Sequence, residues 1–168
     1  MTAAARFKRW AAPWAAVCIS ILVASGDRAG AQTPAPTAAD IAPAGVENAQ
    51  RAWQNWTLNC QGCHRPDGSG TEGTAPSLAG TVAQFLSVPG GRQYLGRVPG
   101  VATSALSNRD LAEVVNWMLW RFDREHLPAK FQPYTADEMA RLRTAPLRME
   151  ASQMRAALLK KAGESRTP

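Results

Sequence analysis

The sequence predicts an all-α fold, because two segments have helical periodicity and no segment has the alternation of a β-strand. The first segment covers residues 46–59, contains no helix breaker and has apolar residues at helical spacing: Ala49, Ala52, Trp53 and Trp56. The second follows Ser107 and has a broad apolar stripe: Leu111, Val114, Val115, Met118, Leu119 and Phe122. We therefore expect a helical domain between residues 45 and 122.

Residues 1–31 have the three parts of a secretory signal peptide. A basic start holds Arg6, Lys8 and Arg9, an apolar stretch covers residues 10–24, and Ala29-Gly30-Ala31 forms a small-residue cleavage site. The apolar stretch is shorter than the ~20 residues that span a bilayer. We expect cleavage, a periplasmic mature protein and no stable membrane span, with an uncleaved anchor as the alternative.

The expected mature chain begins with a flexible leader rich in Ala, Pro and Thr, residues 32–44. It keeps 15 Lys and Arg against 12 Asp and Glu. This near balance gives no reason to expect a nucleic-acid partner.

Cys60-Gln61-Gly62-Cys63-His64 is a C-x-x-C-H motif, which is typical of covalent haem attachment. Cysteines three positions apart lie about one helical turn apart, which suits the two adjacent vinyl groups of one haem. The imidazole of His64 then becomes an iron ligand. We expect one covalently bound haem c, with thioether bonds from both cysteines.

Three other interpretations of this motif are weaker. A zinc site needs a second ligand pair, and His126 is the one strong ligand left downstream. A redox-active dithiol is expected in a βαβ context, which the sequence lacks. A chance match is improbable with so few Cys and His residues, and the third cysteine, Cys18, lies in the signal peptide.

Between the motif and the second helix we expect mainly loops. Residues 65–75 form a glycine-containing loop, residues 81–88 a short helix that ends at Pro89-Gly90-Gly91, and residues 96–105 another loop around Pro99-Gly100. Ser107 is the expected N-cap of the second helix, with Asp110 at the N3 position.

Residues 123–168 form a C-terminal extension with nine Lys and Arg against six Asp and Glu. Prolines keep its first half largely extended, Thr135 and Glu138 form a capping-box pattern before a short helix, and residues 149–162 form a last helix closed by Gly163. We favour a solvated tail, with a belt around the domain or a docking surface for an acidic partner as alternatives.

Residues 45–122 resemble the class I c-type cytochromes. Ala52-x-x-x-Trp56 before the motif is similar to the family's small-x-x-x-aromatic helix, Pro76-Ser77-Leu78-Ala79-Gly80 to its P-x-L-x-G segment, and the helix after Ser107 to its terminal helix. The resemblance implies an all-α domain around one covalently bound haem, in which Trp56 and Trp117 meet where the two helices cross.

The resemblance also implies roles for single residues. Cys60 and Cys63 are the haem anchors, His64 is the proximal iron ligand, the Pro76 carbonyl accepts the second ring N–H of His64, and Leu78 packs against the haem edge. The alternative for Pro76 and Leu78 is a simple turn with a core residue.

The sixth iron ligand departs from the family pattern. Members usually have a methionine in the loop before the last helix, where this chain has Val98, and no methionine occurs between His64 and Trp117. The candidates are Met118, which we place with His64 as a metal ligand, His126 and Met139. An iron with an open sixth position is the remaining alternative.

The resemblance implies a periplasmic one-electron carrier rather than an enzyme, since no catalytic acid, base or nucleophile stands out in the sequence. Its expected partners are periplasmic redox proteins: a dehydrogenase, and an oxidase or another cytochrome. The alternatives are a haem protein that binds a small ligand at an open iron site, and the cytochrome subunit of a larger periplasmic redox complex.

Overall fold

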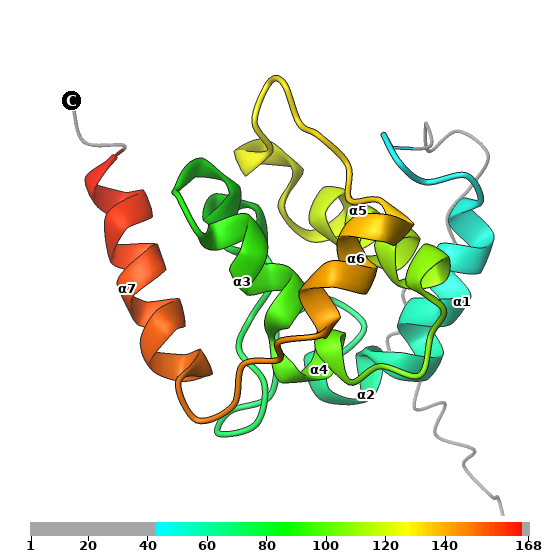
Figure 1. Ribbon diagram of the computed structural model, residues 1–168, viewed down its shortest axis with the longest axis horizontal. Helices are drawn as coiled ribbons and strands as arrows, with labels where there is room; N and C mark the ends of the chain where they lie inside the picture. Colours follow the sequence, from blue (N-terminus) through cyan, green and yellow to red (C-terminus); the bar gives the residue numbers. More distant parts are fainter. Residues whose placement is uncertain (1–42, 166–168) are drawn as a thin grey trace, which may run out of the picture. The chain divides into compact units, whose positions relative to one another are not determined.

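The computed structural model describes residues 43–165, and Figure 1 shows the order of its helices along the chain. The predicted signal peptide and nearly all of the predicted leader lie outside these residues. The α-helices are α1 (Ala49–Asn59), α2 (Gln61–His64), α3 (Gly91–Arg97), α4 (Pro99–Ala102), α5 (Asn108–Asp123), α6 (Ala136–Arg143) and α7 (Ala151–Glu164). Two 3-10 helices, η1 (Val82–Ser87) and η2 (Arg124–His126), complete the described part, which contains no strand. The predicted all-α fold is confirmed.

Helices α1 and α5 pack against each other, as predicted. The helix predicted from residue 46 begins at Ala49, because the side chain of Asn48 accepts the Arg51 N–H and caps the helix there. Ser107 caps α5 in the predicted way, since its side chain accepts the Asp110 N–H. The rings of Trp56 and Trp117 lie 6.0 Å apart between centroids, which confirms their expected meeting at the helix pair.

The prediction of a loop over residues 96–105 was wrong for residues 96–97 and 99–102, which are helical. Helix α3 runs to Arg97, and α4 begins at Pro99. Proline at the first position of a helix loses no hydrogen bond and has a suitable φ, so Pro99 starts a helix rather than breaking one. Gly90, with a φ of +86°, makes the turn between η1 and α3, and helix formation resumes at Gly91. The segment predicted as a helix at 81–88 is the 3-10 helix η1.

The C-terminal extension is part of the core, so our preference for a solvated tail was wrong. Helix α6 contacts α3 and α5, and α7 contacts α3 and η1. Met139 and Ala162 are completely buried, and Leu147 and Leu158 are nearly so. The Thr135 cap of α6 is confirmed by its bond from the Glu138 N–H, whereas the last helix runs through Gly163 to Glu164. The extension therefore packs against α3, α5 and η1.

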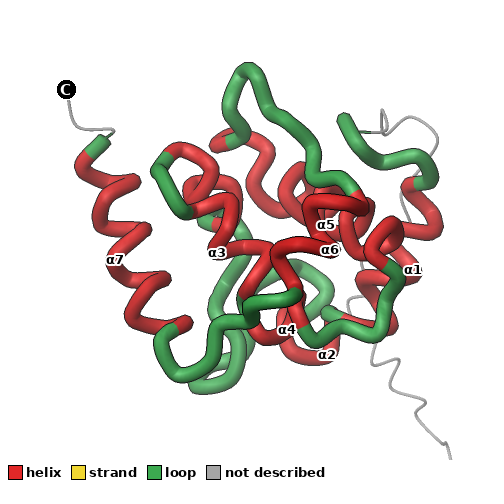
Figure 2. The backbone as a smooth tube through the Cα atoms, viewed as in Figure 1, coloured by secondary structure: helices red, strands yellow, loops and turns green. Residues whose placement is uncertain are grey.

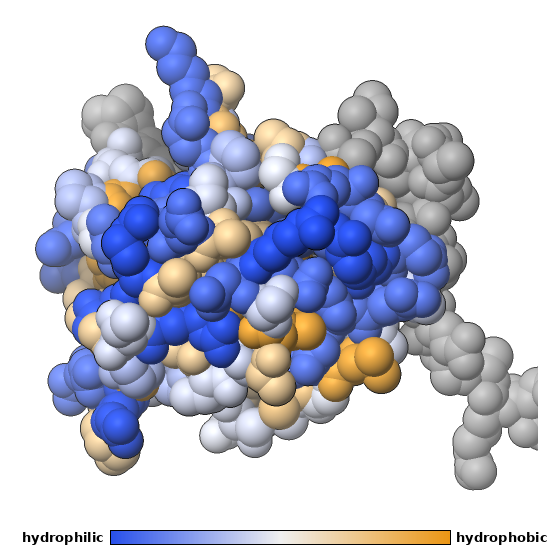
Figure 3. All heavy atoms as spheres, turned by 45° about the vertical axis from the view of Figure 1, so that its right-hand side comes forward, coloured by the Kyte–Doolittle hydropathy of each residue, from blue (hydrophilic) through white to orange (hydrophobic). Residues whose placement is uncertain are grey.

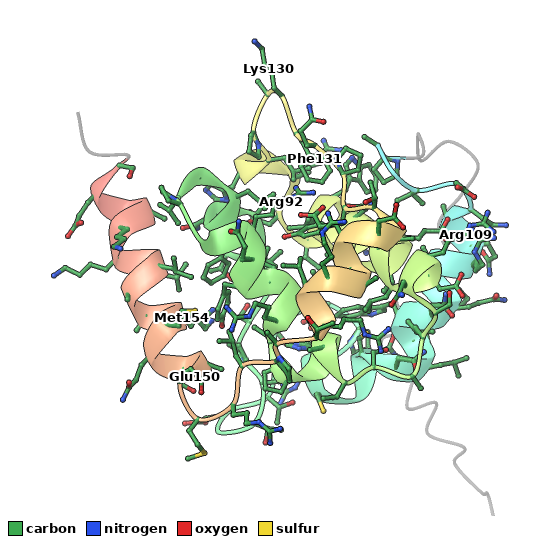
Figure 4. All side chains as sticks on the ribbon, in the orientation of Figure 1. Arg92, Arg109, Lys130, Phe131, Glu150 and Met154 are labelled. Carbon is green, nitrogen blue, oxygen red and sulfur yellow. The ribbon has the colours of Figure 1, made fainter. Side chains whose placement is uncertain are left out.

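Arg92 of α3 fastens the loop that leads from η2 to α6, which Figure 2 shows as an arch. Its guanidinium forms a two-pronged ion pair with Glu138, donates to the carbonyls of Gln132 and Pro133, and stacks 4.0 Å from the ring centre of Tyr134. Figure 4 shows Arg92 beneath this arch, while Lys130 at its tip points away from the helices. These bonds tie the extension to α3.

The surface is mostly polar on the side shown in Figure 3, with small separate hydrophobic patches. Leu58 at the end of α1 and Met149 before α7 are the large hydrophobic residues exposed among residues 43–165. Within that range, no helix has both the length and the apolar character that a membrane crossing needs.

Candidate haem-attachment site

The two cysteines of the motif lie where the chain passes from α1 to α2: Cys60 is the C-cap of α1, and Cys63 is part of α2. Cys60 ends α1, where its N–H donates to the Trp56 carbonyl, and its own carbonyl accepts the N–H groups of Cys63 and His64. The motif therefore folds as one helical turn. Cys60 is half-buried, Cys63 is exposed, and both are free thiols. Two free thiols on one turn are the arrangement that attachment to one macrocycle requires.

Burial raises the pKa of the Cys60 thiol to about 11, and the neighbouring Cys63 adds to this effect. At neutral pH, in the absence of a bound metal ion, Cys60 is thus a neutral thiol. Within residues 43–165, no group of three or more Cys, His, Asp or Glu side chains is arranged to hold a metal ion. The second ligand pair that a zinc site needs is therefore not found among these residues.

The ring of His64 is oriented by the chain that follows it. Its Nδ1 lies 3.1 Å from the Pro76 carbonyl oxygen, the contact that the resemblance implied. Burial lowers the pKa of His64, and the bond to Pro76 opposes that shift in part. A neutral imidazole whose Nδ1–H donates to a carbonyl has its Nε2 lone pair directed outward. This is the form in which histidine binds a metal ion.

A compact loop places Pro76 beside His64. The Gly70 N–H donates to the His64 carbonyl, and the Thr71 hydroxyl donates to the Cys63 carbonyl. Gly70 has a φ of +80°, and a Cβ there would lie 2.5 Å from the Ala75 oxygen and 2.8 Å from the Pro76 oxygen. Only glycine fits this position, because both the conformation and the approach exclude a side chain. The predicted loop is therefore a rigid support for the histidine.

Leu78 lies next in this segment, half-buried and packed against the core. Its N–H donates to the Gly68 carbonyl, and the Gly80 N–H donates to the Phe122 carbonyl at the end of α5. The segment after Pro76 is thus bonded both to its own loop and to α5. These bonds bring Cys60, Cys63, His64 and Pro76 together, whereas the roles of these four residues and of Leu78 at the haem remain predictions.

Trp56 is a contact of His64 that the sequence reasoning missed. The two rings lie 6.1 Å apart between centroids, and Trp56 also packs 4.7 Å from the ring centre of Phe122. The resemblance implies for Trp56 only the contact with Trp117 at the helix crossing. Helical spacing could not indicate this contact, because α1 ends at Asn59 and Cys60 departs from the helical conformation before His64.

The candidates for the sixth ligand occupy three different environments. Met118 is 8% exposed within the packed face of α5, and Met139 is completely buried on α6. Nδ1 of His126 lies 2.5 Å from a carboxylate oxygen of Asp123, whose second oxygen accepts the Ala83 N–H at 2.7 Å. Val98 ends α3 and is half-buried against the core. The assignment of Met118 as a ligand stays a prediction.

The donor set fits a covalently attached haem. Two unpaired thiols stand on one turn, and the next residue presents a neutral imidazole with one nitrogen already occupied by a carbonyl. Cys60, Cys63 and His64 would hold the group, and Pro76 would fix the imidazole. Half-buried apolar side chains around the core provide surface that an apolar macrocycle can cover: Leu78, Leu86, Val98, Val101 and Leu106.

Comparison with known proteins gives relatives of one kind. The chain is 33% identical over 106 residues to cytochrome c-552 of Thermus thermophilus, a match that covers 52% of this chain and 81% of the relative. It is equally similar to a second cytochrome c-552 from a named strain of the same species, of which the match covers 72%. No protein-family model matches the chain.

Proposed function

This chain belongs to the class I c-type cytochromes, and from that premise we propose that it carries single electrons between periplasmic redox proteins through one haem bound covalently to Cys60 and Cys63. The observation that carries the proposal is the single turn with two free thiols, followed by a histidine whose Nδ1 is engaged by Pro76. Haem iron, when bound, supplies one-electron chemistry.

The chain contributes a rigid and apolar surrounding for that chemistry. His64 is held by the Pro76 carbonyl on one side and faces the Trp56 ring on another, so its orientation is fixed. A hydrogen bond to Nδ1 raises the basicity of a ligating imidazole and thereby influences the reduction potential. Because the orientation of His64 is fixed, the iron can change its oxidation state with little structural rearrangement, which favours electron transfer.

The periplasmic location and the redox partners that we propose are inferred from the sequence. The predicted signal peptide directs export, and attachment through two thioethers suits a protein outside the cytoplasm. We propose a dehydrogenase as electron donor, and an oxidase or another cytochrome as acceptor. Leu58, which is 82% exposed two residues before Cys60, gives such partners an apolar contact beside the motif.

A second candidate function is the binding of a small ligand at an iron with an open sixth position. The absence of a methionine from residues 65–116 favours it, because no residue of the connection before α5 can provide a thioether ligand.

Absorption spectra of the reduced protein with and without carbon monoxide separate the two functions. The electron-carrier proposal predicts a sulfur–iron band and no response to the gas. Replacement of Met118 by Leu, which is similar in volume, should abolish that band, whereas the same change at the exposed Met149 should not. Prompt gas binding by the wild-type protein at neutral pH would instead establish the open site.

A further inference from the structure

Helix α7 packs on η1 and α3 with a face that contains its two buried residues, Leu158 and Ala162. Arg155 lies on the same face of the helix, because it precedes these residues by three and seven positions. It is half-buried, and none of the ion pairs within residues 43–165 involves it. A half-buried guanidinium without a carboxylate needs other acceptors for its N–H groups.

The guanidinium of Arg155 finds such an acceptor in the segment that follows Pro76. Its Nη2 donates to the Ser77 carbonyl at 3.3 Å, across 78 positions of the sequence. The central carbon of the guanidinium lies 5.9 Å from the ring centre of Phe85 in η1. Burial raises the pKa of Tyr94 in α3, and the charge of Arg155 opposes this rise. Arg155 therefore connects α7 with η1, α3 and the residue after Pro76.

Ser77 is the neighbour of the group that engages His64. The Pro76 carbonyl, whose oxygen lies 3.1 Å from Nδ1 of His64, and the Ser77 N–H belong to one planar peptide unit. Only the two soft dihedrals of Ser77 separate this unit from the carbonyl that Arg155 binds. A displacement of the Ser77 carbonyl is thus passed on to the Pro76 oxygen.

The bond between Pro76 and His64 needs support, because Pro76 is exposed and water can compete for its carbonyl. Part of the support is local: the Thr81 hydroxyl donates to the Ser77 carbonyl at 2.8 Å. Arg155 adds a second donor to the same oxygen, and this donor comes from a helix that is anchored elsewhere in the core.

We propose that Arg155 is a positioning residue for His64, which acts through Ser77 to hold the Pro76 carbonyl at Nδ1 of the imidazole. The inference rests on the proposed function, because it concerns the imidazole that we expect to ligate haem iron. Each step is a contact within residues 64–81 or between them and α7, so the role of Arg155 does not depend on the identity of the sixth ligand.

Arg155→Met tests this role, because it removes the N–H donors and keeps most of the side-chain stem. Lys161→Met is the matched control, since it removes the same charge at an exposed position of the same helix. Purified holoprotein is measured in the reduced form under carbon monoxide, which is diamagnetic whether or not the protein supplies a sixth ligand. Nuclear magnetic resonance then gives the solvent exchange rate and the chemical shift of the His64 Nδ1 proton, and the amide exchange of α7.

Loss of one hydrogen bond at Ser77 should raise the exchange rate of the His64 Nδ1 proton about two- to tenfold in Arg155→Met. Its resonance should move upfield, because a weaker hydrogen bond deshields the proton less. Lys161→Met should match the wild type in both quantities.

An unchanged Nδ1 proton in a folded Arg155→Met protein overturns the proposal, even if the α7 amides exchange faster, since Arg155 would then only fasten α7. If Arg155→Met does not fold, Arg155→Gln decides in the same way, because its shorter side chain keeps a polar end but should not reach Ser77. Failure of the proposed function is a separate result, since it shows in the wild type as secreted protein without covalent haem.

Discussion

Met139 and Met149 provide a matched test of how the extension contributes to stability. Both lie in residues 123–168, but Met139 is completely buried on α6 whereas Met149 is 93% exposed. Burial of a methionine side chain contributes about 1.5–3 kcal/mol, and the cavity left by truncation adds to the loss. We therefore expect Met139→Ala to lower the free energy of unfolding by about 2–5 kcal/mol. Met149→Ala should change it by less than about 0.5 kcal/mol.

Denaturant unfolding of both variants, followed by far-UV circular dichroism, measures this difference. The midpoint should fall for Met139→Ala with an unchanged slope, and its melting temperature should fall by roughly 10 °C for a domain of this size. Met139→Leu, which conserves volume, should recover most of the loss. Equal midpoints for the two alanine variants would show that the extension is not part of the cooperative core.

Two further outcomes follow from the site and its surroundings. In protein secreted without attached haem, the alkylation rate of Cys60 should rise about tenfold per pH unit up to its pKa of about 11, because only the thiolate reacts. Mass mapping of the alkylated peptides measures this rate. A plateau of the rate near pH 8 would contradict the burial of Cys60. Gly96→Ala should cost about 1–3 kcal/mol of stability, because the added Cβ would lie 2.4 Å from a methyl carbon of Leu142. Leu142→Ala should recover part of this loss, since it removes that methyl carbon and leaves only the Cβ of residue 142 at 3.0 Å. A Gly96→Ala protein as stable as the wild type would refute the contact.

The geometry of the C-x-x-C-H motif was predictable because it is local. Cys60, Cys63 and His64 are close in sequence, and their spacing alone places them on one turn. Pro76 could be assigned only through the resemblance, since it lies twelve positions after His64, at the far end of a loop. The caps at Ser107 and Thr135 were also predictable, because each side chain bonds an N–H three residues later.

The role of the extension was not predictable from the sequence, because it depends on contacts between distant residues. Arg143 bonds residues 35–41 positions earlier, and Arg92 bonds Glu138 46 positions later. Nothing in a count of charges distinguishes these arginines from solvated ones. Likewise, Pro99 and Gly91 locally favour a loop. In the structure they are the first residues of α4 and α3, a position in a helix that tolerates both.

Covalent attachment of one haem is the central claim, and the intact mass of secreted protein tests it most directly. Protein made in cells with working cytochrome maturation should be coloured and have the mass of the processed chain plus one haem. Replacement of both Cys60 and Cys63 by Ala should remove that added mass. Colourless wild-type protein with the mass of the bare chain would contradict the account.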